Sequence, residues 1–149
     1  MSRVFLDTNV LIYIFDRDEP AKQEQATSIF QQRAEDGSAL LSTQVLQEFY
    51  AVSTGKLRSP LSPAEAGTAL GAFAQLPTVP VTPDVILEAA RLHSSDSISF
   101  WDALIVQAAL TGGADVVYSE DLQHGRRFGR LRIQNPFMAD TPLLDAESL

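Results

Sequence analysis

The stretch Val4-Phe5-Leu6-Asp7-Thr8-Asn9-Val10-Leu11-Ile12 opens the chain and sets its organisation. A short apolar run, suited to a buried strand, ends at Asp7, and Asn9 is then expected to cap a helix over residues 10–15. In an open α/β sheet, ligands bind in the crevice beyond the carboxyl ends of the strands, which is where Asp7 would lie. The alternative is local, because Asp and Asn often begin helices and turns without any further role.

Predicted helices and strands alternate along the rest of the chain. Helices are predicted over residues 20–33, 44–53, 63–76, 84–93 and 100–111, and short strands over residues 39–41, 79–81, 115–119 and 131–133. This alternation indicates βα units with a mainly parallel sheet, and the many helices favour a three-layer α/β/α sandwich. We expect one domain over residues 1–137, followed by a surface tail over residues 138–149.

The composition is that of an ordinary soluble protein of 149 residues, 45% hydrophobic and 20% charged. The sequence has no cysteine, which excludes disulfides and zinc–thiolate sites. The net charge of -8 argues against a nucleic-acid binder that relies on bulk attraction, but it allows an acidic site in which divalent cations reverse the local field. No secretory or membrane-spanning run is present, so we expect a cytoplasmic protein without a membrane partner.

Glu48 is the first acid whose position calls for an explanation. In the helix over residues 44–53 it falls on the same stripe as Val45 and Val52, and no basic residue lies one turn away. A carboxylate directed inward needs a partner, because an unpaired buried charge is costly or forces protonation. The alternative places Glu48 at the edge of the stripe, where its carboxylate reaches solvent.

Asp102 repeats this pattern in the last predicted helix. It is the third residue of a capping box that opens at Ser99, and Ile105 and Val106 follow at i+3 and i+4, on the buried face. The sequence alone therefore allows either a site residue or a residue that only helps to start the helix.

Asp121 follows the strand over residues 115–119 and is expected at the same edge of the sheet as Asp7. The alternative is a turn aspartate without further function. The neighbouring Glu120 could share or replace its role, and Asp96, six residues before Asp102, is a further nearby acid that we expect in a loop.

Four acids are thus expected at strand ends or on inward helix faces: Asp7, Glu48, Asp102 and Asp121. Carboxylates that converge repel one another unless a cation joins them, and oxygen ligands without His or Cys favour Mg²⁺ or Mn²⁺ over zinc. Such a site suits metal-assisted hydrolysis of a phosphodiester, in which one or two ions activate water and stabilise the leaving oxygen.

Over about residues 3–137 the chain resembles the PIN-domain ribonucleases, in particular the VapC toxins of bacterial toxin–antitoxin pairs. The matching segments, in order, are Phe5-Leu6-Asp7-Thr8-Asn9-Val10-Leu11, Thr43-Gln44-Val45-Leu46-Gln47-Glu48-Phe49-Tyr50, Ser99-Phe100-Trp101-Asp102-Ala103-Leu104-Ile105 and Tyr118-Ser119-Glu120-Asp121-Leu122. The resemblance implies a PIN-like fold in which Asp7, Glu48, Asp102 and Asp121 hold Mg²⁺ or Mn²⁺, with Asn9 as polar support. It also implies endonucleolytic cleavage of RNA, a cognate antitoxin that lays a peptide across the site, and a homodimer.

The most basic stretch of the chain follows Asp121 and contains four of its eleven basic residues: Arg126, Arg127, Arg130 and Arg132. Arginines beside a metal site could hold RNA phosphates, and Arg126 and Arg127 are the candidates. The alternative is a solvated surface run. His124 could assist proton transfer or be an ordinary loop residue. We expect Phe100 and Trp101 in the core or at a dimer contact rather than stacked on RNA bases.

Two other functions fit parts of the sequence. Phosphatases of the haloacid-dehalogenase type also have an aspartate after a strand, but they place a second aspartate two residues on, where this chain has Asn9. A PIN-like module that only binds proteins is the other alternative, and the complete acidic quartet argues against it.

Overall fold

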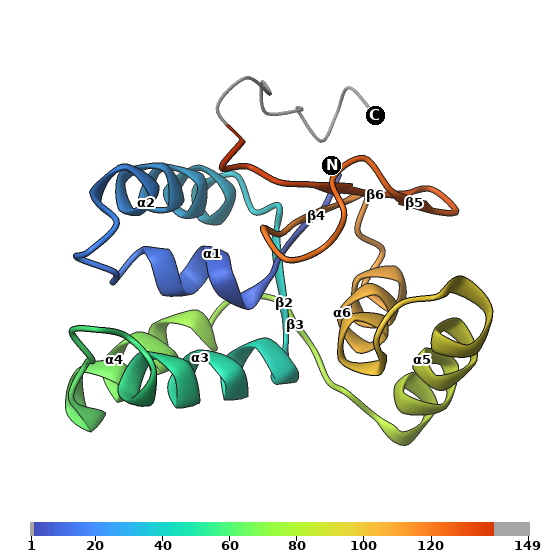
Figure 1. Ribbon diagram of the computed structural model, residues 1–149, viewed down its shortest axis with the longest axis horizontal. Helices are drawn as coiled ribbons and strands as arrows, with labels where there is room; N and C mark the ends of the chain where they lie inside the picture. Colours follow the sequence, from blue (N-terminus) through green and yellow to red (C-terminus); the bar gives the residue numbers. More distant parts are fainter. Residues whose placement is uncertain (1, 139–149) are drawn as a thin grey trace.

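A six-stranded sheet in the order β3-β2-β1-β4-β6-β5 forms the centre of the computed structural model, which describes residues 2–138 (Figure 1). The sheet is parallel except for β5, which runs antiparallel to β6. Its strands are β1 (Val4–Leu6), β2 (Ala39–Ser42), β3 (Thr78–Val79), β4 (Val116–Tyr118), β5 (Arg127–Phe128) and β6 (Leu131–Gln134). The helices are α1 (Thr8–Tyr13), α2 (Pro20–Glu35), α3 (Thr43–Gly55), α4 (Pro63–Phe73), α5 (Pro83–Asp96) and α6 (Phe100–Thr111).

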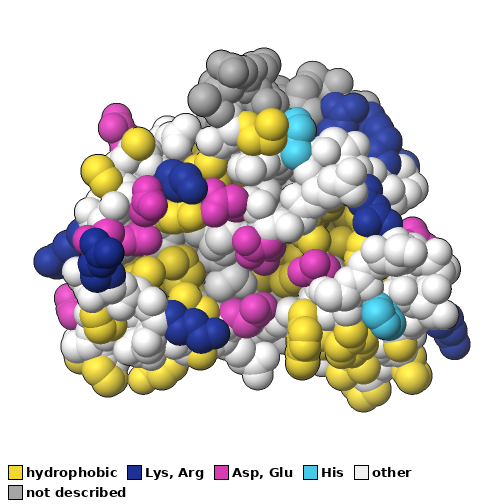
Figure 2. Space-filling view, viewed as in Figure 1, with side chains coloured by type: hydrophobic (Ala, Val, Ile, Leu, Met, Phe, Trp, Pro, Cys, Tyr) yellow, Lys and Arg dark blue, Asp and Glu magenta, His cyan; other side chains and the backbone are white. Residues whose placement is uncertain are grey.

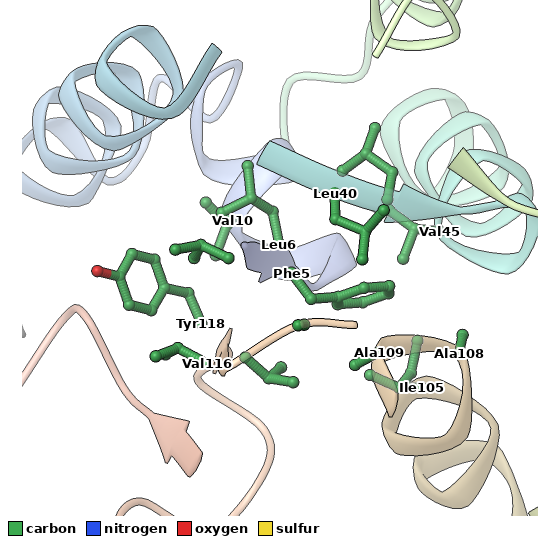
Figure 3. Packing of buried hydrophobic residues seen from close by; sticks show 14 of the residues in the cluster. Phe5, Leu6, Val10, Leu40, Val45, Ile105, Ala108, Ala109, Val116 and Tyr118 are labelled. Atoms are coloured by element: carbon green, nitrogen blue, oxygen red, sulfur yellow. The ribbon is translucent and has the colours of Figure 1, made fainter. Parts of the chain in front are cut away.

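Helices cover both faces of the sheet, which confirms the predicted three-layer α/β/α sandwich. Helices α1 to α4 lie on one side, and α5 and α6 lie on the other (Figure 1). The central strands β1 and β4 are buried at every position because helices shield both of their faces. In the core, Phe5 of β1 lies toward α6, while Leu40 of β2 and Val45 of α3 fill the space beside it (Figure 3).

The strand order places a topological switch between β1 and β4. The chain runs outward from β1 through β2 to β3, and α5 and α6 then return it on the opposite face to β4, directly beside β1. In such sheets the crevice at the carboxyl ends of the two switch-point strands is the usual ligand site. Asp7 follows β1 and Ser119 follows β4, and the Asp7 N–H donates to the Tyr118 carbonyl at 3.0 Å.

Helix α1 begins earlier than expected. The prediction that Asn9 caps a helix over residues 10–15 is wrong, because Asp7 is the N-cap and its carboxylate accepts from the Thr8 N–H at 2.7 Å. The backbone of Asp7 is still extended, with φ -72° and ψ 162°, so the helix starts directly at the end of the strand. The side chain of Asn9 is thereby available for other contacts.

Other boundaries differ by a few residues. Helix α5 continues through residues 94–96, where a loop was expected, and ends at Ser97 in the left-handed region with φ 52°. Helix α4 ends at Phe73 rather than near Pro77, and β3 pairs only over Thr78–Val79, because the prolines at 77 and 80 flank it. The short strand β5 was not expected within the arginine run.

The predicted tail over residues 138–149 lies outside the described residues except for Met138, which is exposed. Within residues 2–138, no helix has both the length and the apolar character that crossing a bilayer requires.

Candidate acidic site at the carboxyl edge of the sheet

Asp7 is a buried carboxylate fixed by short hydrogen bonds. Its exposed fraction is only 7%; one carboxylate oxygen accepts from the Thr8 N–H and the other from the Ser119 hydroxyl at 2.7 Å. Burial raises the pKa of Asp7 from 3.8 to about 6, and the charges of Asp121 and Glu48 add to the rise, whereas the bonds to Ser119 and Thr8 oppose it. Asp7 is therefore held by hydrogen bonds in a buried position where neighbouring carboxylates disfavour its charge.

Asn9 and Ser119 connect Asp7 to Asp121. The Asn9 amide nitrogen lies 3.5 Å from an Asp7 carboxylate oxygen and 3.2 Å from an Asp121 carboxylate oxygen. The Ser119 hydroxyl, which donates to Asp7, accepts from the Asp121 N–H at 3.1 Å. Sequence reasoning missed Ser119, although a small polar residue at the end of a buried strand was a signal for it.

Glu48 reaches the same region from α3, but not from the buried stripe. The expectation of an inward-facing Glu48 is wrong, since its side chain is exposed while Val45 and Phe49 occupy the inward positions. Partial burial still raises the pKa of Glu48, and the charges of Asp121 and Asp102 raise it further. Its carboxylate thus lies at the rim of the site, within electrostatic reach of the other acids.

Asp102 lies in the first turn of α6 and is half-buried. Its N–H donates to the Ser99 hydroxyl at 3.1 Å, so the predicted helix cap is present. The cap uses the backbone of Asp102, while its carboxylate lines a cavity together with Asp121. The cap and the site role are therefore compatible in this residue.

Two adjoining cavities form what we call the acidic cleft, and Asp121 lines both. The Glu48 cavity, of about 290 Å³, is lined by Thr8, Asn9, Ile12, Tyr13, Asp16, Glu48, Val52, Glu120 and Asp121. The Arg126 cavity, of about 250 Å³, is lined by Ser97, Ile98, Ser99, Asp102, Asp121, Leu122, Gln123, Arg126, Phe128 and Ile133. Acidic side chains gather in the hollow at the middle of this face (Figure 2). A larger cavity of about 800 Å³, between α2 and Pro136–Met138, contains none of the four predicted carboxylates.

The donor chemistry of the cleft fits a hard divalent cation. The charges of neighbouring carboxylates raise the pKa of Asp7 and of Glu48, an effect that a bound cation would reverse, and carboxylate oxygens are the ligands that Mg²⁺ and Mn²⁺ prefer. Within residues 2–138, however, no three Asp, Glu, His or Cys side chains are already gathered so that they could hold a metal ion. Glu48, Asp102 and Asp121 thus line an open cleft, and the buried Asp7 is linked to Asp121 by the Asn9 amide. The four carboxylates do not form a finished ligand shell.

Glu120 and Asp96 are engaged elsewhere. The Glu120 carboxylate accepts from the Tyr13 hydroxyl at 2.6 Å and from the Lys22 ammonium at 2.7 Å. Glu120 lines only the Glu48 cavity, whereas Asp121 lines both cavities. Asp96 is the last residue of α5 rather than a loop residue, and it lines neither cavity of the cleft.

The arginine run divides between the two edges of the sheet. Arg126 is half-buried and lines the cleft, whereas Arg127 is exposed on β5 and pairs with Arg132 of β6, away from the cleft. Arg130, 3.6 Å from Asp115, and Arg132, paired with Val116, lie at the opposite edge, where β4 begins. The ring of the exposed His124 accepts from the Asn135 N–H at 3.0 Å and lines neither cavity.

The two aromatic residues before Asp102 have different surroundings. Phe100 packs against the small cluster of Ala89, Ala103 and Leu104. Trp101 is 67% exposed and does not belong to the core. Of the two positions expected for Trp101, the core is therefore wrong, and a dimer contact stays a prediction.

Comparisons with known proteins match this sequence to a family model and this fold to solved structures. A family model described as PIN domain matches residues 4–129. VapC20 of Mycobacterium tuberculosis, a toxin that cleaves the sarcin-ricin loop, has 19% identity and a TM-score of 0.63 over 79% of this chain and 89% of its own. Comparison with curated proteins gives no significant match.

Two DNA-bound assemblies are also similar in structure. VapBC of Salmonella typhimurium has 18% identity and a TM-score of 0.65 over 91% of this chain and 99% of its own. VapBC2 of Rickettsia felis, bound to a fragment of its promoter, has 19% identity and a TM-score of 0.63 over 89% and 97%, respectively. At these identities the likeness to solved structures establishes the fold.

Proposed function

The chain belongs to the PIN-domain family, whose model matches residues 4–129, and from this premise we propose that it is a metal-dependent endoribonuclease that hydrolyses RNA phosphodiester bonds. One observation carries the proposal. Glu48, Asp102 and Asp121 line one cleft at the switch point of the sheet, and the Asn9 amide links the buried Asp7 to Asp121. The charges of the neighbouring carboxylates add to the burial that raises the pKa of Asp7 and of Glu48.

These four carboxylates would hold Mg²⁺ or Mn²⁺. When bound, the ion would lower the pKa of water and stabilise the negative charge that develops on the phosphate. The protein's own contribution is positioning: Ser119 and Thr8 fix Asp7, and Asn9 ties Asp7 to Asp121. Asn9 is thus proposed as the polar support of the site.

Substrate binding would combine the ion with nearby arginines. RNA is a polyanion and the chain carries a net charge of -8, so a cation in the cleft and local arginines must supply the attraction. Arg126, which lines the cleft, and the exposed Arg127 beside it are proposed to hold RNA phosphates.

We further propose that the protein is the toxin of a toxin–antitoxin pair and acts in the cytoplasm as a homodimer. The similarity to VapC20 and to two VapBC assemblies supports a cognate antitoxin as its partner. A peptide of that antitoxin laid across the acidic cleft would block access of RNA.

A protein-binding module without nuclease activity is the second candidate. It is favoured by one observation, that the carboxylates within residues 2–138 do not already form a group able to hold a metal ion. The phosphatase alternative is excluded, because the chain belongs to the PIN-domain family.

Cleavage of a mixed cellular RNA pool separates the two candidates. The purified chain should cut RNA with Mg²⁺ or Mn²⁺ and not with EDTA, and Asp121→Asn should lower the rate by more than about 100-fold, beyond the loss typical of outer partners of a metal site. Asp115→Asn, at the opposite edge of the sheet, is the matched control and should cut normally. A folded chain that cuts nothing with any metal, once freed of bound partners, would favour the binding module.

A further inference from the structure

We propose that the Arg126 cavity is a subsite for one nucleotide of the RNA chain, with Arg126 as its recognition residue. The cavity adjoins the catalytic carboxylates, since Asp102 and Asp121 form part of its wall. A nucleotide in this position would lie directly beside the cleaved bond. That the ligand is part of an RNA chain rests on the proposed function. That the cavity accepts one nucleotide is inferred from the residues that line it.

The lining combines apolar and polar groups in the manner of a ligand pocket. Ile98, Leu122 and Phe128 supply apolar surface, and Ser99 and Gln123 supply hydrogen-bonding groups. Pockets for whole small molecules usually exceed about 300 Å³. The volume of about 250 Å³ therefore suits a single planar base with part of its ribose phosphate rather than a larger ligand.

Arg126 supplies the charge that a nucleotide requires. Among the described residues it is the one Lys or Arg that lines either cavity of the acidic cleft. Its guanidinium lies 4.8 Å from the centre of the Phe128 ring and donates one hydrogen bond to the Asp96 carbonyl. A guanidinium has five N–H donors, so an oriented Arg126 keeps donors for a phosphate or for the edge of a base.

The part of the cavity wall formed by residues 97–99 is held in a fixed shape. Ser97 has a positive φ of 52°, a conformation that is costly for a residue with a side chain. The His93 ring is hydrogen-bonded to the Ile98 carbonyl across this turn. The turn between α5 and α6 is thus tied back to α5, which preserves the cavity before a ligand enters.

The test is an NMR titration of the ¹⁵N-labelled full chain with each ribonucleoside 5′-monophosphate in the presence of EDTA. Shifts should be confined to the amides of residues 97–99 and 121–128, and one base should bind more tightly than the others. Arg126→Ala should weaken binding by about tenfold, as loss of a charge-assisted hydrogen bond predicts. Arg130→Ala, which changes an arginine at the opposite edge of the sheet, should leave binding unchanged.

A conservative variant covers the case in which Arg126→Ala disturbs the contacts with Phe128 and Asp96. Arg126→Lys keeps the stem and the charge but loses the planar fork, and it should bind mononucleotides about threefold more weakly than the unchanged chain. In cleavage-site mapping, both Arg126 variants should lose base preference at one position next to the cut.

The outcomes separate this inference from the proposed function. Nucleotide binding at the cavity by a chain that cuts no RNA would contradict the nuclease and leave the subsite standing. Metal-dependent cutting by a chain that shows no shifts at residues 97–99, or whose Arg126→Ala variant binds and cuts with unchanged affinity and preference, would overturn the subsite.

Discussion

Asp7 serves two purposes at the scale of a single residue. Its carboxylate caps α1 by accepting from the Thr8 N–H, and it also receives the Ser119 hydroxyl at the switch point of the sheet. The local reading of this aspartate as a helix cap is therefore correct without excluding a role in the site. What distinguishes Asp7 from an ordinary cap is its burial next to other carboxylates, which raises its pKa.

The raised pKa predicts a pH dependence of stability in the metal-free protein. The folded state binds the Asp7 proton more tightly than the unfolded chain does, because the pKa rises from 3.8 to about 6 on folding. As the pH increases through this window, Asp7 lowers the free energy of unfolding by up to about 3 kcal/mol. Asp7→Asn should therefore be more stable than the unchanged protein at about pH 7.5, and this advantage should vanish near pH 4.

Urea unfolding in EDTA at both pH values measures this effect. Asp18→Asn, which changes an exposed aspartate, is the control and should show no such difference between the two pH values. An Asp7→Asn variant that is less stable than the unchanged protein by the same margin at both pH values would show that the hydrogen bonds of Asp7 outweigh its burial.

Individual site residues differed in how far the sequence could predict them. Asp7 and Asp102 were predictable because each stands at a junction that local patterns reveal, a strand end and a helix start. Ser119 was not, because its role depends on β4 lying beside β1, a contact between segments more than a hundred residues apart in the chain. For Glu48 the sequence left two positions open, the centre of the apolar stripe or its edge, because periodicity does not separate them, and the structure places it at the edge.

At the scale of elements, α2 is joined to the turn after β4 by a small network at the rim of the cleft. Lys22 of α2 donates to Glu120 at 2.7 Å and lies 3.3 Å from the Tyr13 hydroxyl, which itself donates to Glu120. The Glu120 N–H in turn donates to the Asn9 side chain at 3.1 Å. The network fixes the turn that presents Asp121, so we regard Lys22 as a positioning residue.

Lys22→Met should therefore lower the kcat of RNA cleavage by about tenfold with little change in KM. The fold should lose less than about 1 kcal/mol, because both partners of the ion pair are partly exposed. Lys56→Met, which changes the only other lysine of the sequence, is the control. A Lys22→Met variant with normal kcat would show that Asp121 needs no support from α2.

The end of α6 packs too closely against the sheet to accept a side chain. A Cβ at Gly112 would lie 2.5 Å from the Leu40 Cδ2 and 2.7 Å from the Val79 Cγ2. Gly112→Ala should lower the free energy of unfolding by about 1–3 kcal/mol, the usual cost of overpacking. Gly71→Ala, inside α4 and facing open space, should raise it by about 0.5–1 kcal/mol. Equal stability of the two variants in urea would contradict this packing.

Elements with strong local signals were predictable. The capping box at Ser62 and Glu65 is present with both of its hydrogen bonds, and α4 begins where it predicts. The two-residue strand β3 had only a weak signal, which placed it over residues 79–81, and β5 had none; each pairs with a neighbouring strand of the sheet. Helix α5 continues through residues 94–96, three polar residues that resemble a loop in the sequence.

At the scale of the whole molecule, the order of the strands creates the site. Reversal of the winding between β1 and β4 brings acids from the start, the middle and the end of the chain to one edge of the sheet. Alternating helices and strands predict such a sheet in general terms. The position of β4 next to β1 is a non-local pairing that hydrophobic periodicity does not contain, and the structure supplies it.

The proposed homodimer has a candidate surface on α5 and α6. The exposed large apolar side chains of these helices are Ile86, Leu87, Trp101 and Leu110. In Figure 2, apolar side chains gather at the lower right, which is where Figure 1 shows α5 and α6. Trp101→Ala combined with Leu87→Ser should weaken dimerisation at least about tenfold in sedimentation equilibrium. Tyr50→Ala, on α3 across the sheet, is the control. A chain that is monomeric at all concentrations would contradict the dimer.

The central claim is that four carboxylates from separate elements together bind a divalent cation, and calorimetric titration of the metal-free protein with Mn²⁺ tests it most directly. Binding should be present in the unchanged chain and in Asp115→Asn, and each of Asp7→Asn, Asp102→Asn and Asp121→Asn should weaken it at least about tenfold. Absence of binding by the folded, unchanged chain, or equal binding by all of these variants, would contradict the account.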